Sequence, residues 1–458
     1  MLQLWTRFAI SLALCAASCL AAVAQTPHAL RYAPGKSITL TLPDELDIHI
    51  AASGLRRVRF FAQSPDGRMF ATGMHDLSDN RLGSVFILEG WDEKTHRFTH
   101  VTHYLDHLRN PNNLAFWTDP STHQSWLYLP LTDKLVRYKY NAGDEAPSSE
   151  PETLIRFPDY GLSYKYGGWH LTRSVAIAQV HGATRVVVAT GSSCNYCQEH
   201  EVLRAAIVSL DPDGSNPSLV AQGMRNAVDL HAVAALDGTL FATNMGDDHL
   251  GDQLPEDTFF AIDTTSAMPK NYGWPACYFA DGKPVHDKTP LPAFDEGKIA
   301  KIPAADSVYG KQTGVAAAGT NLTAGGGHVA GPDPNAAVGT PPLALASCEQ
   351  VPAAYTTFAA HSSPLGFDYF GEGDSVLRQS FLVALHGASH PHIGTGYRVV
   401  RFSPADRKPR DLITGFLSVA SGKATVHGRP CGILRLGPDR FLLSDDYLGL
   451  IYFVHPRS

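Results

Sequence analysis

The chain contains the run Arg185-Val186-Val187-Val188-Ala189-Thr190 and, after a loop, Ala206-Ile207-Val208-Ser209-Leu210 with the turn Asp211-Pro212-Asp213-Gly214. Runs of five or six residues rich in valine and isoleucine, bounded by Gly, Pro and Asp, are typical of short β-strands. An Asp-Pro-Asp-Gly turn reverses the chain and leads into the next strand. The stretch therefore predicts a pair of neighbouring strands closed by a tight turn.

Similar strand pairs recur on both sides of this stretch. They are found at Trp126–Leu131 with Lys134–Tyr138, at Phe381–Leu385 with Tyr397–Phe402, and at Phe441–Ser444 with Leu450–Val454. About six units of roughly 40 to 70 residues fit the length, which is the period of a β-propeller with decorated loops. We predict an all-β fold, a six-bladed β-propeller with long loop insertions. A pair of long β-sandwiches is the structural alternative.

The composition is that of a globular protein. Of 458 residues, 44% are hydrophobic and 18% are charged, and the net charge is -7. Nucleic acid is not an expected partner, because phosphate binding needs clustered Lys and Arg and the chain has no such run.

The N-terminus has the form of a signal peptide. Arg7 precedes an apolar run at 8–17, and Ala22-Val23-Ala24 fits an A-x-A cleavage site. The run is shorter than the roughly 20 residues that a membrane span needs, which disfavours a transmembrane anchor. We expect a leader at 1–24, a single catalytic domain at 25–458, and a periplasmic or secreted protein.

Five cysteines remain after the leader. Cys194 and Cys197 have the spacing of a tight bridge, a redox pair or half a metal site, but no second close Cys or His pair completes a zinc site. We expect the disulfides Cys194–Cys197 and Cys277–Cys348, with Cys431 free. The segment 308–345 is rich in Ala, Gly, Thr and Pro and is expected to be a low-complexity insertion stapled by the second bridge.

Several tight turns carry the polar residues that chemistry requires. His170 follows Gly167-Gly168 and is the candidate general base, since histidine titrates near neutrality. Arg225 and Asn226 follow Gly223, and Arg429 follows Gly428; each guanidinium can pair with a carboxylate. The acidic stretch at 244–257 offers oxygen ligands of the kind that Ca²⁺ prefers, although it lacks EF-hand spacing.

These segments together resemble the soluble pyrroloquinoline quinone (PQQ)-dependent sugar dehydrogenases, in particular the sorbosone dehydrogenase-like branch of the glucose/sorbosone dehydrogenase family. The resemblance runs in order from about Phe60 to Val454. It is carried by the following motifs: His170 with Arg173, Gly191–Asn195, Arg225-Asn226, the acidic loop 247–257, Asn271–Pro275, His361–Gly366, Leu385–Gly387 and Gly428–Pro430.

The resemblance implies a six-bladed propeller that holds PQQ with Ca²⁺ and transfers electrons to an external acceptor. His170 would take the proton of a sugar hydroxyl while hydride passes to the calcium-activated quinone. The resemblance also implies cofactor contacts from Arg225, Asn226, Arg429 and His386, metal ligands at Asp247, Asp248, Gly251 and Asp252, and a substrate side shaped by Tyr272 and Trp274.

Two departures from the family pattern bear on function. Trp169 stands where glucose-oxidising relatives have a carboxylate, so another group must orient His170. The segment 388–392 lacks the arginine that relatives often have there. The main expectation is oxidation of an aldose or sorbosone-like sugar. The alternatives are a calcium-dependent lactonase-type propeller and a non-catalytic propeller that binds a sugar or a protein.

Overall fold

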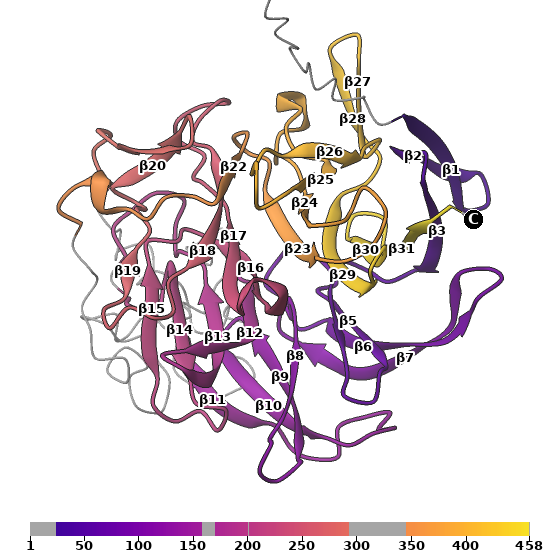
Figure 1. Ribbon diagram of the computed structural model, residues 1–458, viewed down its shortest axis with the longest axis horizontal. Coiled ribbons are helices and arrows are strands. Elements are labelled where there is room, and N and C mark those ends of the chain that lie inside the picture. Colours follow the sequence, from indigo (N-terminus) through magenta and orange to yellow (C-terminus); the bar gives the residue numbers. More distant parts are fainter. Residues whose placement is uncertain (1–23, 158–169, 200, 293–344, 458) are drawn as a thin grey trace, which may run out of the picture.

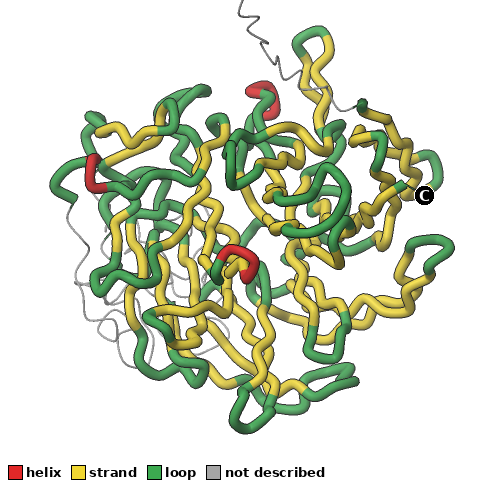
Figure 2. Tube along the Cα trace, viewed as in Figure 1, coloured by secondary structure: helices red, strands yellow, loops and turns green. Residues whose placement is uncertain are grey.

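The computed structural model describes residues 24–157, 170–199, 201–292 and 345–457. The described chain is almost entirely β-structure, with short 3-10 turns at η2 (Ala234–Leu236), η4 (Cys348–Gln350) and η5 (Pro391–Ile393) (Figure 2). Six sheets of at least four strands form the blades of a propeller (Figure 1). The predicted fold class is confirmed.

The first three blades are antiparallel sheets of consecutive strands. In the third blade, the short strand β19 also pairs in parallel with the outer strand β15. Their strands are β4 (Val58–Gln63), β5 (Met69–Gly73), β6 (Gly83–Asp92) and β7 (Arg97–Leu108); β8 (Ala115–Thr118), β9 (Ser125–Leu131), β10 (Lys134–Tyr140) and β11 (Glu152–Arg156); and β12 (Arg173–Val180), β13 (Ala183–Thr190), β14 (Ala206–Leu210), β15 (Ser218–Gln222) and β19 (Lys270–Asn271).

The last three blades follow the same plan with longer connections. Their strands are β16 (Ala227–Val233), β17 (Thr239–Asn244), β18 (Asp257–Ile262) and β22 (Thr356–Phe358); β23 (Pro364–Phe370), β24 (Ser380–Leu385), β25 (Arg398–Phe402) and β26 (Arg410–Ile413); and β29 (Pro430–Gly437), β30 (Arg440–Asp445), β31 (Leu450–Pro456) and β3 (Leu46–Ser53). Three hairpins lie outside the blades: β1 (Gln25–Ala33) with β2 (Lys36–Pro43), β20 (Cys277–Ala280) with β21 (Lys283–His286), and β27 (Leu417–Ala420) with β28 (Lys423–Val426).

The two ends of the chain close the ring. β3 pairs antiparallel with β31, so a strand from the N-terminal part of the chain completes the C-terminal blade (Figure 1). The innermost strands then contact one another in the cyclic order β4, β8, β12, β16, β23 and β29, and β29 contacts β4. Because closure leaves each blade with two neighbours, the apolar faces of all six sheets can be covered.

The hydrophobic core lies between the blades. Six clusters of buried side chains each fill one seam between neighbouring blades, such as Phe241, Phe259, Phe367 and Phe381 between the fourth and fifth. Strands that pack on both faces need apolar residues at successive positions, which explains the unbroken Val-Val-Val run of β13.

Hydroxyl groups join successive blades close to the axis. A Thr or Ser at the end of a second strand donates to a carbonyl at the inner strand of the next blade. The pairs are Thr72 to Asn112, Thr132 to Leu171, Thr243 to Leu365, and Ser444 to Arg59. The blades approach so closely there that a Cβ atom at Gly366 would lie 2.6 Å from the carbonyl oxygen of Cys431.

The disulfide predictions are confirmed. Cys194 is bonded to Cys197 and Cys277 to Cys348, and Cys431 is a buried free thiol. The leader at 1–24 and the insertion at 308–345 lie outside the described residues except for residues 24 and 345, and so does Trp169. No helix in the described part of the chain has the length and apolarity needed to cross a membrane.

Candidate active site

A cavity of about 490 Å³ opens at the end of the ring where the chain enters the inner strands. His170 lies just before β12, Arg225 and Asn226 lie before β16, and Arg429 lies before β29. His386 follows the second strand of its blade, β24, and reaches the same end because the strands are antiparallel. All five residues line this one cavity, although up to 259 positions separate them in sequence (429 − 170).

His170 is held in one tautomer by its Nδ1 atom. Nδ1 lies 3.1 Å from the carbonyl oxygen and 2.9 Å from the hydroxyl oxygen of Ser192. The hydroxyl donates its own proton to the carbonyl of Cys194 at 2.6 Å, so both Ser192 oxygens accept from Nδ1–H. The lone pair is therefore on Nε2, which is the atom that would act as a base.

The charge state of His170 also suits a base. Burial, and after it the charge of Arg225, holds the pKa of His170 well below its ordinary value, while the Ser192 carbonyl acts in the opposite direction. The imidazole is neutral at pH 7 and can accept a proton. Ser192 is therefore the group that orients His170, as the absence of a carboxylate at position 169 requires.

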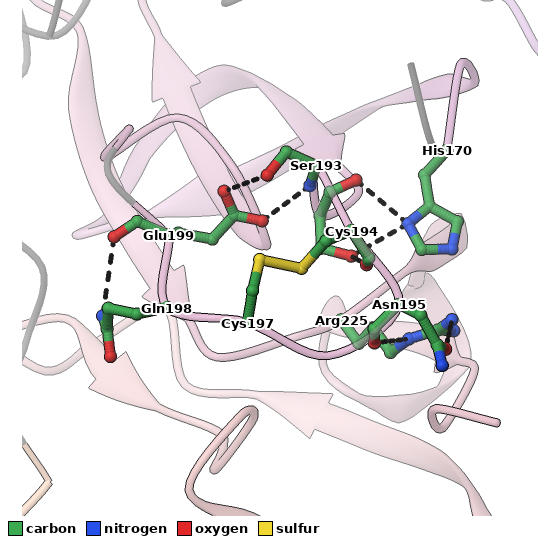
Figure 3. The surroundings of a disulfide bond; sticks show 9 residues. His170, Ser193, Cys194, Asn195, Cys197, Gln198, Glu199 and Arg225 are labelled. Atoms are coloured by element: carbon green, nitrogen blue, oxygen red, sulfur yellow. Dashed lines mark hydrogen bonds between the residues drawn. A yellow bond between two sulfur atoms is a disulfide. The ribbon is translucent and has the colours of Figure 1, made fainter. Parts of the chain in front are cut away.

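The Cys194–Cys197 loop also holds Arg225, as Figure 3 shows. The guanidinium donates from Nε to the carbonyl of Asn195 at 2.8 Å, from Nη2 to Oδ1 of Asn195 at 2.7 Å, and from Nη1 to the carbonyl of Gly246 at 2.6 Å. These acceptors are neutral and orient the guanidinium, and the carboxylate of Asp248 lies 3.7 Å from its Nη2 atom. One disulfide-closed loop thus positions both the candidate base and a candidate anion-binding cation.

Arg429 is a second cation held by neutral groups. It donates to the carbonyls of Gly387 and Ala388, each at 3.0 Å, and to the hydroxyl of Tyr397 at 2.8 Å. Its Nη1 also lies 3.3 Å from Nδ1 of His386, which must accept that bond. His386 then donates from Nε2 to Asp446 at 2.8 Å and is neutral, in keeping with a pKa that burial lowers.

Asp446 forms ion pairs with two further arginines, which no motif in the sequence pointed to. Its carboxylate is buried and accepts from Arg59 at 2.9 Å and from Arg57 at 3.2 Å, and both arginines line the cavity. Burial alone would raise the pKa of Asp446, but His386, Arg59 and Arg57 hold it well below its ordinary value. No motif marks these arginines in the sequence: Arg59 lies on β4 and Arg57 directly before it, far along the chain from the cavity residues named above.

The predicted calcium loop lies beside the cavity. Asp248 lines the cavity, and its carboxylate is hydrogen-bonded to Nδ1 of His361 at 3.0 Å. The carbonyl of Gly251 accepts a hydrogen bond from Nε2 of the same ring. Asp247 is buried 2.7 Å from His249, and Asp252 is exposed. In the described chain these carboxylates do not gather into a set of three ligands. Asp257, at the end of the same acidic stretch, also lines the cavity, and burial raises its pKa to about 7.

Tyr272 and Trp274 are not among the residues that line the cavity. Tyr272 is in the seam between the third and fourth blades, edge-on to Phe260 at 4.9 Å. Trp274 packs against the Cys194–Cys197 disulfide with Ala205. Their part in the Asn271–Pro275 motif is thus to pack the scaffold behind the site.

The cavity suits an anionic ligand. Four arginines line it against two aspartates, and its volume is in the range of cofactor sites. The amide of Asn226 is buried, with an Oδ1 atom that lacks a hydrogen-bond partner in the described structure. A Cβ atom at Gly191 would collide with both Asn226 and His170, so this glycine keeps the space that the two side chains need.

Comparison with solved structures supports the fold. The chain resembles a calcium structure of a Trichoderma reesei protein of Carbohydrate-Active Enzymes Family AA12, with TM-score 0.60, 14% identity and coverage of 91% and 96% of the two chains. It also resembles the holo form of a pyranose dehydrogenase PQQ domain from Coprinopsis cinerea, with TM-score 0.59, 14% identity and coverage of 91% and 97%. A glucose dehydrogenase aligns with TM-score 0.51 and 12% identity over 90% and 99%. No family model and no curated protein matches the sequence.

Proposed function

We propose that this protein is a PQQ-dependent dehydrogenase that oxidises an aldose or a sorbosone-like sugar. The observation that carries the proposal is the arrangement of His170. A neutral imidazole with its lone pair on Nε2 lies in the same cavity as two arginines, Arg225 and Arg429, that backbone carbonyls hold in place. The solved structures of the same fold include a pyranose dehydrogenase PQQ domain, which supports the choice of cofactor.

The residues fit PQQ by charge and by hydrogen bonding. Arg225 and Arg429 would each hold a carboxylate of the cofactor, and the Asn226 amide would bond to a quinone oxygen. The arginine that relatives often have at 388–392 has no counterpart on that segment, but Arg57 and Arg59, at the start of β4, line the same cavity. His386 would act through Arg429, which it contacts, rather than through the cofactor directly.

His170 would act as the general base. Its Nε2 atom removes the proton of the hydroxyl on the carbon to be oxidised, while Nδ1–H stays bonded to Ser192. The two Ser192 acceptors stabilise the imidazolium that forms, and Arg225 favours the return of its proton to solvent. When bound, PQQ supplies the electrophilic quinone that accepts the hydride and later passes electrons to an external acceptor.

Calcium stays a prediction for this chain. Asp248 and Asp257 are the carboxylates that line the cavity among the described residues. Ca²⁺ takes six to eight oxygen ligands, more than two carboxylates supply. We therefore assign no step to a cation. Periplasmic or secreted location follows from the predicted leader and likewise stays a prediction.

The decisive experiment is reconstitution of the purified protein with PQQ, with and without Ca²⁺. PQQ binding is measured by absorbance titration, and turnover by dye reduction with a panel of aldoses and sorbosone. Absence of both signals would reject the proposal. Lactone hydrolysis in the same preparation would instead favour the lactonase alternative.

The role of His170 has its own test. His170→Ala is expected to retain PQQ binding and to lose about 10²- to 10⁴-fold in kcat, the usual contribution of a general base. His286→Ala, at an exposed position on β21, is the matched control and should be unaffected. Turnover that survived in His170→Ala would show that another group is the base.

A further inference from the structure

Three histidines meet at the seam where the propeller closes. His49 lies on β3, His455 on β31, and His96 in the turn between β6 and β7. β3 and β31 belong to the last blade, whereas β6 and β7 belong to the first, and their hairpin reaches β3 (Figure 1). None of the three lines the cavity described above.

The three rings are within reach of a common ion. The ring centroids of His96 lie 4.5 Å from those of both His49 and His455, and one nitrogen of each ring lies within 4.8 Å of the others. Imidazole nitrogens on a tetrahedral Zn²⁺, at bonds of about 2.0 to 2.1 Å, are roughly 3.4 Å apart. Small side-chain rotations would bring the rings to that spacing.

Two nitrogens of these rings also lack a hydrogen-bond partner among the described residues. Nδ1 of His455 donates to the carbonyl of Pro456 at 2.7 Å, so its Nε2 carries a lone pair. That Nε2 atom and Nδ1 of His96 are shielded from solvent and make no hydrogen bond within the described structure. Buried polar atoms without a partner need an explanation, and a binding site for an ion is one of the few available.

A carboxylate flanks the cluster. Asp47 precedes His49 by two residues on β3, is paired with His455 in the strand register, and has an oxygen 3.6 Å from Nε2 of His49. An acidic group beside a histidine ligand orients the ring and offsets the charge of the ion. Imidazole ligands suit first-row transition metals rather than Ca²⁺ or Mg²⁺.

We propose that His49, His96 and His455 form a binding site for a divalent transition-metal ion of the Zn²⁺ type. The ion would connect the last blade to the first, and thereby hold the two ends of the ring together. The site is distinct from the cavity and does not depend on the proposed function.

The test uses the mature protein after removal of metals with a chelator. Zn²⁺ is titrated by calorimetry, and Co²⁺ by its visible absorption, which reports tetrahedral nitrogen coordination. We expect one saturable site per chain, and a rise in Tm of about 3 °C at a hundredfold excess of Zn²⁺ over Kd.

Two variants and one control assign the site. His96→Asn suits the left-handed backbone at this position (φ 53°), and His455→Gln removes a second ligand from another strand. Each should weaken binding by roughly tenfold or more, which cuts the rise in Tm by about half or more at the same Zn²⁺ concentration. His286→Gln, at an exposed histidine elsewhere, should keep both. Absence of saturable binding, or binding unchanged in both variants, would overturn the proposal.

Discussion

Ser192→Ala tests whether the disulfide-closed loop orients the candidate base. Nδ1 of His170 has two acceptors on this residue, the hydroxyl oxygen at 2.9 Å and the carbonyl oxygen at 3.1 Å, and the substitution removes only the first. One hydrogen bond contributes about 0.5 to 1.5 kcal/mol. We therefore expect kcat to fall by about 2- to 13-fold, far less than in His170→Ala.

The assay is steady-state dye reduction by the protein reconstituted with PQQ, over a range of pH. Because the hydroxyl stabilises the imidazolium, its loss should lower the pKa of His170 further and move the acid limb of the kcat profile to lower pH. KM and PQQ affinity should stay unchanged, since Ser192 does not line the cavity. A purely structural role for Ser192 would not move the pH profile.

Ser193→Ala is the matched control. Ser193 is the adjacent residue in the same buried loop, but its hydroxyl donates to Glu199 at 2.8 Å and does not contact His170. Its loss should cost stability of about 1 kcal/mol and leave kcat within about twofold. Equal falls in kcat for the two variants, or no fall in Ser192→Ala, would refute the proposed role of Ser192.

Three further predictions concern the scaffold, the base and the cofactor site. Gly366→Ala should lower the free energy of unfolding in urea by about 1 to 3 kcal/mol, because its Cβ would lie 2.6 Å from backbone of β29; Gly437→Ala, with nothing within 4 Å, should change it by less than about 0.5 kcal/mol. Burial lowers the pKa of His170, so the base stays neutral as pH falls, and the acid limb of kcat/KM should lie below pH 6.5; a limb above that value would contradict this. Arg429→Ala should weaken PQQ binding in absorbance titrations by about tenfold to a hundredfold, whereas exposed Arg440→Ala should not; equal affinities would exclude Arg429 as a cofactor contact.

The sequence predicts the fold well because the signals for the fold are local. Short β-branched runs and Asp, Gly and Pro turns mark the strands of each blade, as in β13 and β14. The cysteine pairing was also predictable, since Cys194 and Cys197 are three residues apart and Cys277 and Cys348 flank one insertion. The closure of the ring by β3 was not foreseen, because this pairing joins residues about 400 positions apart.

The sequence by itself also determined which polar turns would meet. His170, Arg225, Asn226, His386 and Arg429 were proposed from their motifs, and they line one cavity. Only the tertiary structure decided what each side chain contacts. Ser192 holds His170, and Arg57 and Arg59, which line the cavity, are ion-paired with Asp446.

Tertiary structure likewise decided that Tyr272 and Trp274 pack behind the site and that three histidines meet at the closing seam. The physical reason is the same in each case. Strand formation depends on neighbours in sequence, whereas the direction of a side chain near the axis depends on how six blades pack around a closed ring.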